Sequence, residues 1–364
     1  MEGESTLAHR FHLDVPLVLG LAVLSAIGLV VVYSASGQDL QLVMRQGIRL
    51  LIAFGVMFLL AQVTPRQYLN WTPVLYLVVL ALLVAVLLVG LVGKGAQRWI
   101  DLGLFSFQPS EAAKIAVPMM CAYYLSERNL PPRLATVLAA LLLIVLPVVL
   151  IARQPDLGTA LLIGASGAFV LFLAGVRWRT ILGAAFALAA SAPLAWIAMR
   201  DYQRRRVSTF FNPEQDPLGA GYHIIQSKIA IGSGGLYGKG WLNGTQSQLD
   251  FIPERSTDFI FAVFSEEFGL LGVLGLMMVY CFVVWRGLYL ASQAQELFGR
   301  LVGCSLVLTF FVYVFVNMGM VSGLLPVVGI PLPLVSYGGT SLVTVMAAFG
   351  ILMSMHAHRR LLSS

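Results

Sequence analysis

Charged side chains are scarce in this sequence. Of its 364 residues, 11% are Asp, Glu, Lys or Arg and 59% are hydrophobic, and the mean hydropathy is +0.86. An average soluble domain carries about a quarter charged residues, so this chain has too little polar surface for a soluble protein. In a soluble protein the net charge of +6 would suggest nucleic-acid binding. In a membrane protein it more simply indicates Lys and Arg on the cytoplasmic side, next to anionic lipid phosphates.

Several kinds of functional site are also missing. The cysteines (Cys121, Cys281 and Cys304) lie in apolar runs, are odd in number and lack metal-ligand spacing, which argues against a disulfide framework or a metal site. The five histidines form no constellation, and no Gly-x-Ser-x-Gly motif marks a hydrolase. The glycine-rich stretch 232–240 fails the P-loop pattern. Its glycines are more typical of sharp backbone turns.

Long apolar runs occupy most of the chain. A membrane-spanning helix needs roughly 20 apolar residues, and ten candidate runs lie at 15–34, 47–63, 73–92, 110–125, 134–152, 157–175, 180–199, 259–285, 300–321 and 339–355. We therefore predict an all-α, polytopic membrane helix bundle that forms a single domain over residues 1–364. One long loop, about 200–258, separates the seventh and eighth runs.

The positions of Lys and Arg orient this bundle. If the N-terminus is inside, the short inner loops hold ten arginines and the short outer loops hold five basic residues. Basic residues favour the cytoplasmic side, and long loops translocate largely regardless of charge. We therefore predict that both termini are cytoplasmic and that loop 200–258 is extracellular.

Two opposite charges begin the fourth run. Glu111 and Lys114 are three residues apart, so they lie on one helix face and can pair. Charges within a membrane span are costly and usually face each other or a cavity. Either these two form a self-neutralising structural pair, or Lys114 also faces an anionic substrate.

Asp258 lies where the long loop meets the eighth run. Residues 256–258 precede an apolar helix and could serve simply as its N-cap. The position also suits a catalytic acid, because a lipid-linked substrate would present its head group at this membrane surface. Arg255 is nearby and could contact phosphate. Glu266 and Glu267 follow in the same helix and need a polar cavity, so a polar stripe could descend from Asp258.

Three stretches of the sequence resemble one known family. They are Arg98-Trp99-Ile100 with the segment 107–114, the segment 229–240 with 253–259, and the segment 331–341. On these motifs, and over essentially the whole chain, the sequence resembles the shape, elongation, division and sporulation (SEDS) family of integral membrane proteins.

The resemblance implies a peptidoglycan glycosyltransferase that acts in cell-wall elongation and rod-shape maintenance. Such enzymes polymerise lipid II, a disaccharide-peptide on undecaprenyl pyrophosphate, at the outer face of the bacterial cytoplasmic (inner) membrane. The catalytic acid of the family falls on Asp258, and its fourth-span ion pair falls on Glu111 and Lys114. The implied protein partners are a class B penicillin-binding protein, which is a transpeptidase, and other membrane proteins of the elongation complex.

The chemistry of that reaction assigns further roles. Converting an α-linked sugar diphosphate into a β-linked product inverts the anomeric carbon, and a carboxylate suits the base that takes the acceptor proton. The departing pyrophosphate needs facing cations. The candidate substrate-binding residues are Arg45, Arg49, Arg98, Glu111, Lys114 and Arg255. A divalent cation, Mg²⁺ or Mn²⁺, could assist them, although the sequence identifies no ligands for it.

Two other functions fit the composition. A flippase for lipid II could use the buried charges to line its path, but we see no pair of matched halves with broken helices, which is the usual sign of a transporter. A scaffold that only recruits the transpeptidase explains the apolar chain but not the buried charges.

Small residues in and after the ninth run offer a contact surface. They are Gly303, Ser305, Gly319, Ser322 and Gly323. Small residues allow helices to approach closely in a membrane. They either contact the anchor helix of the transpeptidase or pack within the bundle itself.

Overall fold

The computed structural model describes most of the chain. The described residues are 12–93, 96–101, 106–199, 204, 208–210, 212, 219–249, 251–252 and 254–357. Much of the first half of the long loop therefore lies outside the described residues, as do Pro253 and the basic residues near both termini.

Helices occupy all of the predicted spans. They are α2 (Val15–Ala35), α3 (Leu40–Gln62), α4 (Pro65–Val89), α5 (Pro109–Ser126), α6 (Leu134–Arg153), α7 (Leu157–Leu173), α8 (Trp178–Ala198), α12 (Ile260–Ser292), α13 (Leu297–Val321) and α14 (Thr340–Ala357). Within the described residues, seven of these are long and apolar enough to cross a membrane, namely α2, α3, α4, α6, α12, α13 and α14. The chain is a multi-pass helical membrane protein, as predicted.

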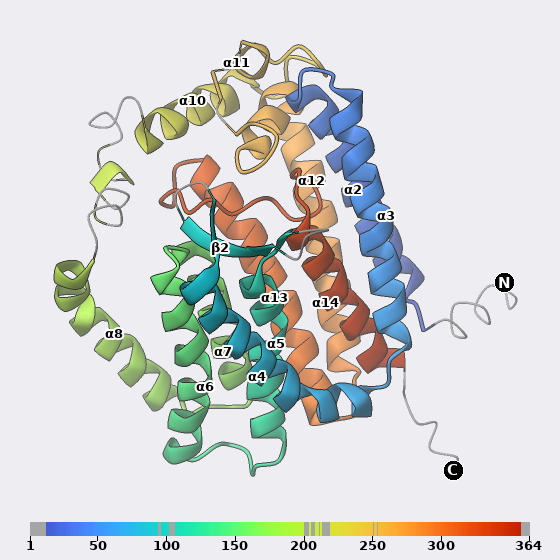
Figure 1. The fold of residues 1–364 in the computed structure, drawn as a ribbon. Coiled ribbons are helices and arrows are strands. Elements are labelled where there is room, and N and C mark those ends of the chain that lie inside the picture. Colours follow the sequence, from blue (N-terminus) through green and yellow to red (C-terminus); the bar gives the residue numbers. More distant parts are fainter. Residues whose placement is uncertain are drawn as a thin grey trace, which may run out of the picture.

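The polar segments also contain structure that the sequence reading did not anticipate. Strands β1 (Leu91–Gly93), β2 (Ala96–Asp101) and β3 (Ser106–Phe107) form a small antiparallel sheet in the order β1-β2-β3. In the long loop, α10 (Ala220–Ser233) and α11 (Thr245–Gln248) lie across one end of the bundle, at the top of Figure 1. We refer to this end as the loop end.

Helix α13 lies between two groups of helices. Its Phe310 and Val314 are buried in a core built mainly by α2, α3, α12 and α14. Its Val302 and Leu306 are buried in a second core with α4, α5, α6 and α7. Helix α8 lies at the side of the molecule in Figure 1. Because α13 is packed on both sides, it connects the loop end rigidly to both halves of the bundle.

The first and last described helices meet at the end opposite the loop end. The Asp14 side chain caps α2 by accepting from the Leu17 N–H at 3.0 Å, and it also pairs with Arg286 of α12 at 2.7 Å. The Ser354 hydroxyl donates to the Val63 carbonyl, just beyond α3. The start of α2 and the end of α14 therefore lie on the same side of the bundle.

Helix α12 is broken at Gly269, whose backbone has φ +62° and ψ −165°. A break exposes backbone groups that lipid cannot satisfy. The glycine-rich loop that follows α10 supplies their partners. The N–H groups of Lys239 and Gly240 donate to the Glu266 and Glu267 carbonyls, both at 3.0 Å. In the other direction, the N–H groups of 270 and 271 donate to the carbonyls of 235 and 236 at 3.0 and 3.1 Å.

The glycines of this loop permit that close approach. A Cβ at Gly238 would lie 2.1 Å from the Glu267 carbonyl oxygen, and one at Gly234 would lie 2.2 Å from the Ser265 carbonyl oxygen. Gly235, Gly238 and Gly240 also have positive φ, which glycine adopts without steric cost. The predicted sharp turns are confirmed, and their role is to bring one backbone against another.

Glu266 fixes the rest of the loop. Its carboxylate is fully buried and accepts from the Lys239 ammonium at 2.6 Å, the Thr245 hydroxyl at 3.1 Å and the Gln246 N–H at 3.0 Å. Glu267 accepts from the Ser34 hydroxyl of α2. Because both acids bind structural groups of the loop end, the polar stripe that we expected to descend from Asp258 is wrong for these residues.

Two neighbouring glycines provide a test of this docking. We expect Gly234→Ala to destabilise the protein by about 1–3 kcal/mol, the usual effect of an overpacked site, because its methyl group would collide with backbone. Gly232→Ala is the matched control, since a Cβ there has nothing within 4 Å among the described atoms. The measurement is the thermal unfolding midpoint of each purified variant in detergent. Equal midpoints for the two variants would contradict the docking.

Candidate active site

The turn before α12 carries Asp258 and is held by three separate hydrogen bonds. The Ser256 carbonyl accepts from the Tyr337 N–H at 2.8 Å, and the Thr257 carbonyl accepts from the Ser336 hydroxyl at 2.6 Å. The Asp258 carbonyl accepts from the Asn317 side-chain amide at 2.9 Å. Each of three consecutive carbonyls thus has a donor from outside the turn, so the position of the Asp258 backbone is fixed by other elements.

Asp258 is not the N-cap of its helix. The N-cap of α12 is Phe259, which makes no side-chain cap hydrogen bond, and the first helical turn closes from the Ala262 N–H to the Phe259 carbonyl at 3.0 Å. The simpler structural interpretation, in which residues 256–258 cap the helix, is therefore wrong. The Asp258 side chain is partly exposed.

The Asp258 carboxylate lies beside the loop that joins α13 to α14. A Cβ built on Gly329 would lie 3.4 Å from Asp258 Oδ2, which is the nearest atom to it. Gly329 has φ +75°, a conformation that L side chains rarely adopt. The same loop reaches α7, because a Cβ at Gly158 would meet the Val328 carbonyl oxygen at 3.2 Å. The segment 328–330 therefore lies between Asp258 and the start of α7.

Asp156 is the N-cap of α7, and its carboxylate contacts several polar groups. Its carboxylate accepts from the Thr159 N–H at 3.2 Å as the helix N-cap, and from the Gln108 amide at 3.4 Å. The Arg98 guanidinium lies 3.7 Å from the same carboxylate and donates to the backbone carbonyls of Gln154 and of residue 155. Strand β2 and the α6–α7 turn are thereby joined at the loop end.

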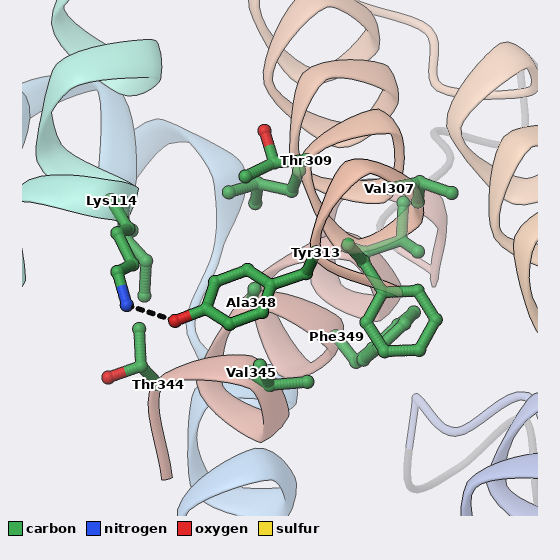
Figure 2. Close-up of a pocket in the computed structure, with 12 residues that line it drawn as sticks. Lys114, Val307, Thr309, Tyr313, Thr344, Val345, Ala348 and Phe349 are labelled. Carbon is green, nitrogen blue, oxygen red and sulfur yellow. Dashed lines mark hydrogen bonds between the residues drawn. The ribbon is translucent and has the colours of Figure 1, made fainter. Parts of the chain in front are cut away.

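Glu111 and Lys114 form the predicted ion pair, deep in the bundle. Their charged atoms are 2.7 Å apart, and the side chains are only 8% and 6% exposed. The Lys114 ammonium also binds the Tyr313 hydroxyl of α13, as Figure 2 shows. It lies at the edge of a cavity of about 30 Å³ whose walls are almost entirely apolar. That volume suffices for about two water molecules.

The remaining predicted cations lie nearer the loop end. The Arg49 guanidinium of α3 stacks over the Tyr337 ring, 4.6 Å from its centroid, and Tyr337 in turn holds the Asp258 turn. Arg45 lies one helical turn earlier and is exposed. Arg255 donates to the carbonyl of Ser247 in α11. The structure thus places Arg49 in a shared network with Asp258, whereas Lys114 is engaged inside the bundle.

Sequence reasoning missed several polar residues of this network. Gln46 of α3 donates to the Ser336 carbonyl at 3.2 Å and accepts from the Gly338 N–H at 3.3 Å. Asn317 and Tyr313 are polar residues within an apolar helix, and their spacing of four places them on one face. That spacing was the available signal. The partners of Asp156 and Gln46 lie far away in the sequence and could not be found from it.

No group of three or more His, Cys, Asp or Glu side chains that could hold a metal ion is found among the described residues. The structure therefore assigns no ligands to the divalent cation that we considered from sequence.

The small residues of α13 divide into two sets. A Cβ at Gly303 would meet the Leu352 side chain at 2.9 Å and Ala291 at 3.0 Å, and the buried Ser305 hydroxyl donates to the Ser166 carbonyl at 2.7 Å. These two pack within the bundle. Gly319 and Ser322 instead line a groove on the outside of α12 and α13.

The buried pair yields a stability prediction. Removing one partner of a buried ion pair typically costs about 3–5 kcal/mol, so Lys114→Met and Glu111→Leu should each lower the unfolding midpoint and the yield. The double variant Lys114→Met/Glu111→Leu should recover both, because no unpaired charge remains. The measurement is thermal unfolding of the three purified variants, and additive losses in the double variant would contradict the pairing.

Comparison with known proteins places this architecture in a family. A family model described as "Cell cycle protein" (FtsW, RodA, SpoVE) matches residues 15–361. The peptidoglycan glycosyltransferase MrdB of Escherichia coli K12 is 54% identical over 361 residues, covering 99% of this chain and 98% of that protein. A probable peptidoglycan glycosyltransferase FtsW of Geobacter metallireducens is 37% identical and covers 94% of each.

Solved structures show the same arrangement. The crystal structure of the rod shape determining protein RodA from Thermus thermophilus is 32% identical, with a TM-score of 0.73, and the match covers 95% of this chain and 97% of that one. A chain from a structure on the coordination of polymerization and crosslinking by a peptidoglycan synthase complex is 34% identical, with a TM-score of 0.83, over 94% of this chain and 97% of that one. The chain therefore belongs to the SEDS family of FtsW, RodA and SpoVE proteins.

Proposed function

We propose that Asp258 is the general base of a peptidoglycan glycosyltransferase that joins lipid II disaccharides into glycan strands. The chain is a glycosyltransferase of the SEDS family, with relatives of that name at 54% and 37% identity. The observation that carries the assignment of the base is the turn at 256–258, in which three carbonyls are held from outside while the carboxylate points beside Gly329.

This geometry suits proton abstraction. A general base must hold a defined position within hydrogen-bond reach of the acceptor hydroxyl. The backbone of Asp258 is fixed by α13 and by the α13–α14 loop, so only the side-chain torsions have to be ordered when the substrate binds. The glycine beside it keeps side-chain atoms out of the approach. Taking the hydroxyl proton allows the oxygen to attack the anomeric carbon from the face opposite the pyrophosphate.

The leaving pyrophosphate requires positive charge. Arg49 is connected to the Asp258 turn through Tyr337, whose ring lies under the guanidinium and whose N–H binds the Ser256 carbonyl. Arg45 on the same helix and Arg98 at β2 extend this positive rim. Guanidinium groups bind phosphate oxygens in a bidentate manner. We assign the pyrophosphate to these arginines and give Lys114 and Glu111 a structural role beneath the site.

The orientation follows from the same proposal. Lipid II polymerisation belongs to the outer face of the bacterial inner membrane, so the loop end with Asp258 is extracellular and both termini are cytoplasmic. At the opposite end of the bundle, His12 contacts the end of α3 and the Asp14 N–H contacts Met353 near the end of α14. The end of α14 also binds the residue after α3. These contacts support the proposal that both termini lie in one compartment.

A flippase remains the second candidate because of the break in α12. Broken helices in transporters expose backbone groups that bind substrate or ions. In this chain the exposed groups at Gly269 are bonded to the backbone of 235–240, so they are not open to cargo. This observation favours a structural role for the break.

The decisive variant is Asp258→Asn. It keeps the backbone carbonyl that Asn317 holds and removes only the basic oxygen, so we expect polymerisation to fall by about 10²–10⁴-fold, the usual contribution of a general base. The measurement is glycan formation from lipid II by purified protein in detergent. Because detergent has no sidedness, a flippase or a scaffold would form no polymer even as wild type. Near-normal polymerisation by Asp258→Asn would overturn the assignment of the base.

The groove on α12 and α13 fits a protein partner. It has a volume of about 710 Å³ and is lined by apolar or small side chains that include Met277, Cys281, Phe311, Phe315 and Gly319. None of the described residues that line it is charged, so its occupant must be apolar at membrane depth. We assign it to the single membrane helix of a class B penicillin-binding protein, which would keep the transpeptidase beside the growing strand.

Filling the groove should separate the two proteins. Cys281→Trp places a large ring in the groove, and Leu142→Trp is its control on the exposed face of α6, where the residue is 67% exposed. We expect Cys281→Trp to reduce co-purification with the transpeptidase at unchanged yield, whereas Leu142→Trp should leave it unchanged. Normal co-purification by Cys281→Trp would place the interface elsewhere.

A further inference from the structure

Asn317 is a buried amide whose contacts lie on both sides of the Asp258 carboxylate. Its side chain belongs to α13 and is fully buried. One amide nitrogen donates to the Asp258 carbonyl at 2.9 Å and to the Ile330 carbonyl at 2.6 Å. A side-chain amide has two N–H donors, so both are used on backbone groups beside Asp258.

These two carbonyls belong to segments that are far apart in the sequence. Asp258 lies in the turn before α12. Ile330 follows Gly329, and a Cβ built on Gly329 would lie 3.4 Å from Asp258 Oδ2. Asn317 therefore fixes the distance between the carboxylate and the backbone that flanks it. The other donors to the turn, Ser336 and Tyr337, come from the continuation of that same loop.

Helix α13 gives this amide a rigid support. One helical turn away, Tyr313 binds the Lys114 ammonium of α5, and the helix is packed on both sides by the two cores. The segments 254–259 and 328–339 both lack regular secondary structure, and Gln46 of α3 holds the second of them separately. The Asn317 amide bonds both of these irregular segments to α13.

We infer that Asn317 is a positioning residue for glycosyl transfer, which acts by setting the Asp258 carboxylate against the acceptor hydroxyl. This inference rests on the proposed role of Asp258. A misplacement of about 1 Å can lower the rate of an enzyme about 100-fold. Loss of the amide should therefore lower kcat and leave the binding of the lipid substrate, and thus KM, largely unchanged.

The test uses two replacements of Asn317 in the full-length protein. Asn317→Leu keeps the branched shape and removes both donors, and Asn317→Ser retains one hydroxyl donor. We expect kcat for lipid II polymerisation in detergent to fall about 100-fold in Asn317→Leu and less in Asn317→Ser, at similar KM. If Asn317→Leu does not fold, Asn317→Ser alone carries the comparison. Wild-type kcat in a folded variant would overturn the inference.

A double-mutant cycle separates positioning from general stability. Ser336→Ala removes the donor to the Thr257 carbonyl, on the same turn. Effects on kcat of Asn317→Ser and Ser336→Ala should not multiply, because residues that hold one element are energetically coupled. Ser305→Ala is the control, because it removes a comparable bond on the same helix, to the Ser166 carbonyl. The fold-changes in kcat caused by Ser305→Ala and Asn317→Ser should simply multiply in the double variant. Simple multiplication in both cycles would contradict the inference.

Asp258→Asn, measured in parallel, distinguishes the two ways of failing. If Asp258→Asn polymerises normally, the proposed base is wrong and Asn317 cannot act through it. If Asp258→Asn is inactive while folded Asn317→Leu or Asn317→Ser has normal kcat, the proposed function stands and the positioning role alone fails.

Discussion

Hydrocarbon offers no hydrogen-bond partners, and this constraint organises the loop end of the bundle. Helix α12 is irregular at two places, in the turn that precedes Ile260 and at Gly269. The carbonyls of the turn are satisfied by Asn317, Ser336 and Tyr337, and the break is satisfied by the glycine-rich loop. Both irregularities therefore depend on segments far away in the sequence, and the position of the carboxylate depends on the same bonds.

Buried charge obeys the same rule. Lys114 is bound by Glu111 and Tyr313, and Glu266 is bound by Lys239 and backbone of the loop. Since an unpaired charge inside the bundle is costly, these residues are explained by the fold that they stabilise. The arginines of α3 are different, because Arg45 is exposed and Arg49 is partly exposed. Burial thus distinguishes the paired charges inside the bundle from the arginines of α3 at its surface.

Run length and residue type predicted the spans because both are local properties of the chain. The ion pair of Glu111 and Lys114 was equally local, at a spacing of three, and it is confirmed. The break at Gly269 and the contacts of Asn317 depend on partners tens of residues away in the sequence, so no periodicity revealed them. The helix start at Phe259 rather than at Asp258 was missed for a related reason. Capping preference favours Asp, but the external donors hold Asp258 outside the helix.

The bonding between the glycine-rich loop and α12 has a consequence for biogenesis. The loop precedes α12 in the chain, so during synthesis its N–H and carbonyl groups emerge before the helix that they will satisfy. Until both segments are present, the N–H and carbonyl groups of the loop must bond to water at the membrane surface. The broken helix cannot enter the hydrocarbon until its own free backbone groups have hydrogen-bond partners. The segment from α10 to α12 must therefore assemble at the interface as one unit, and insertion and tertiary folding of this region become a single step.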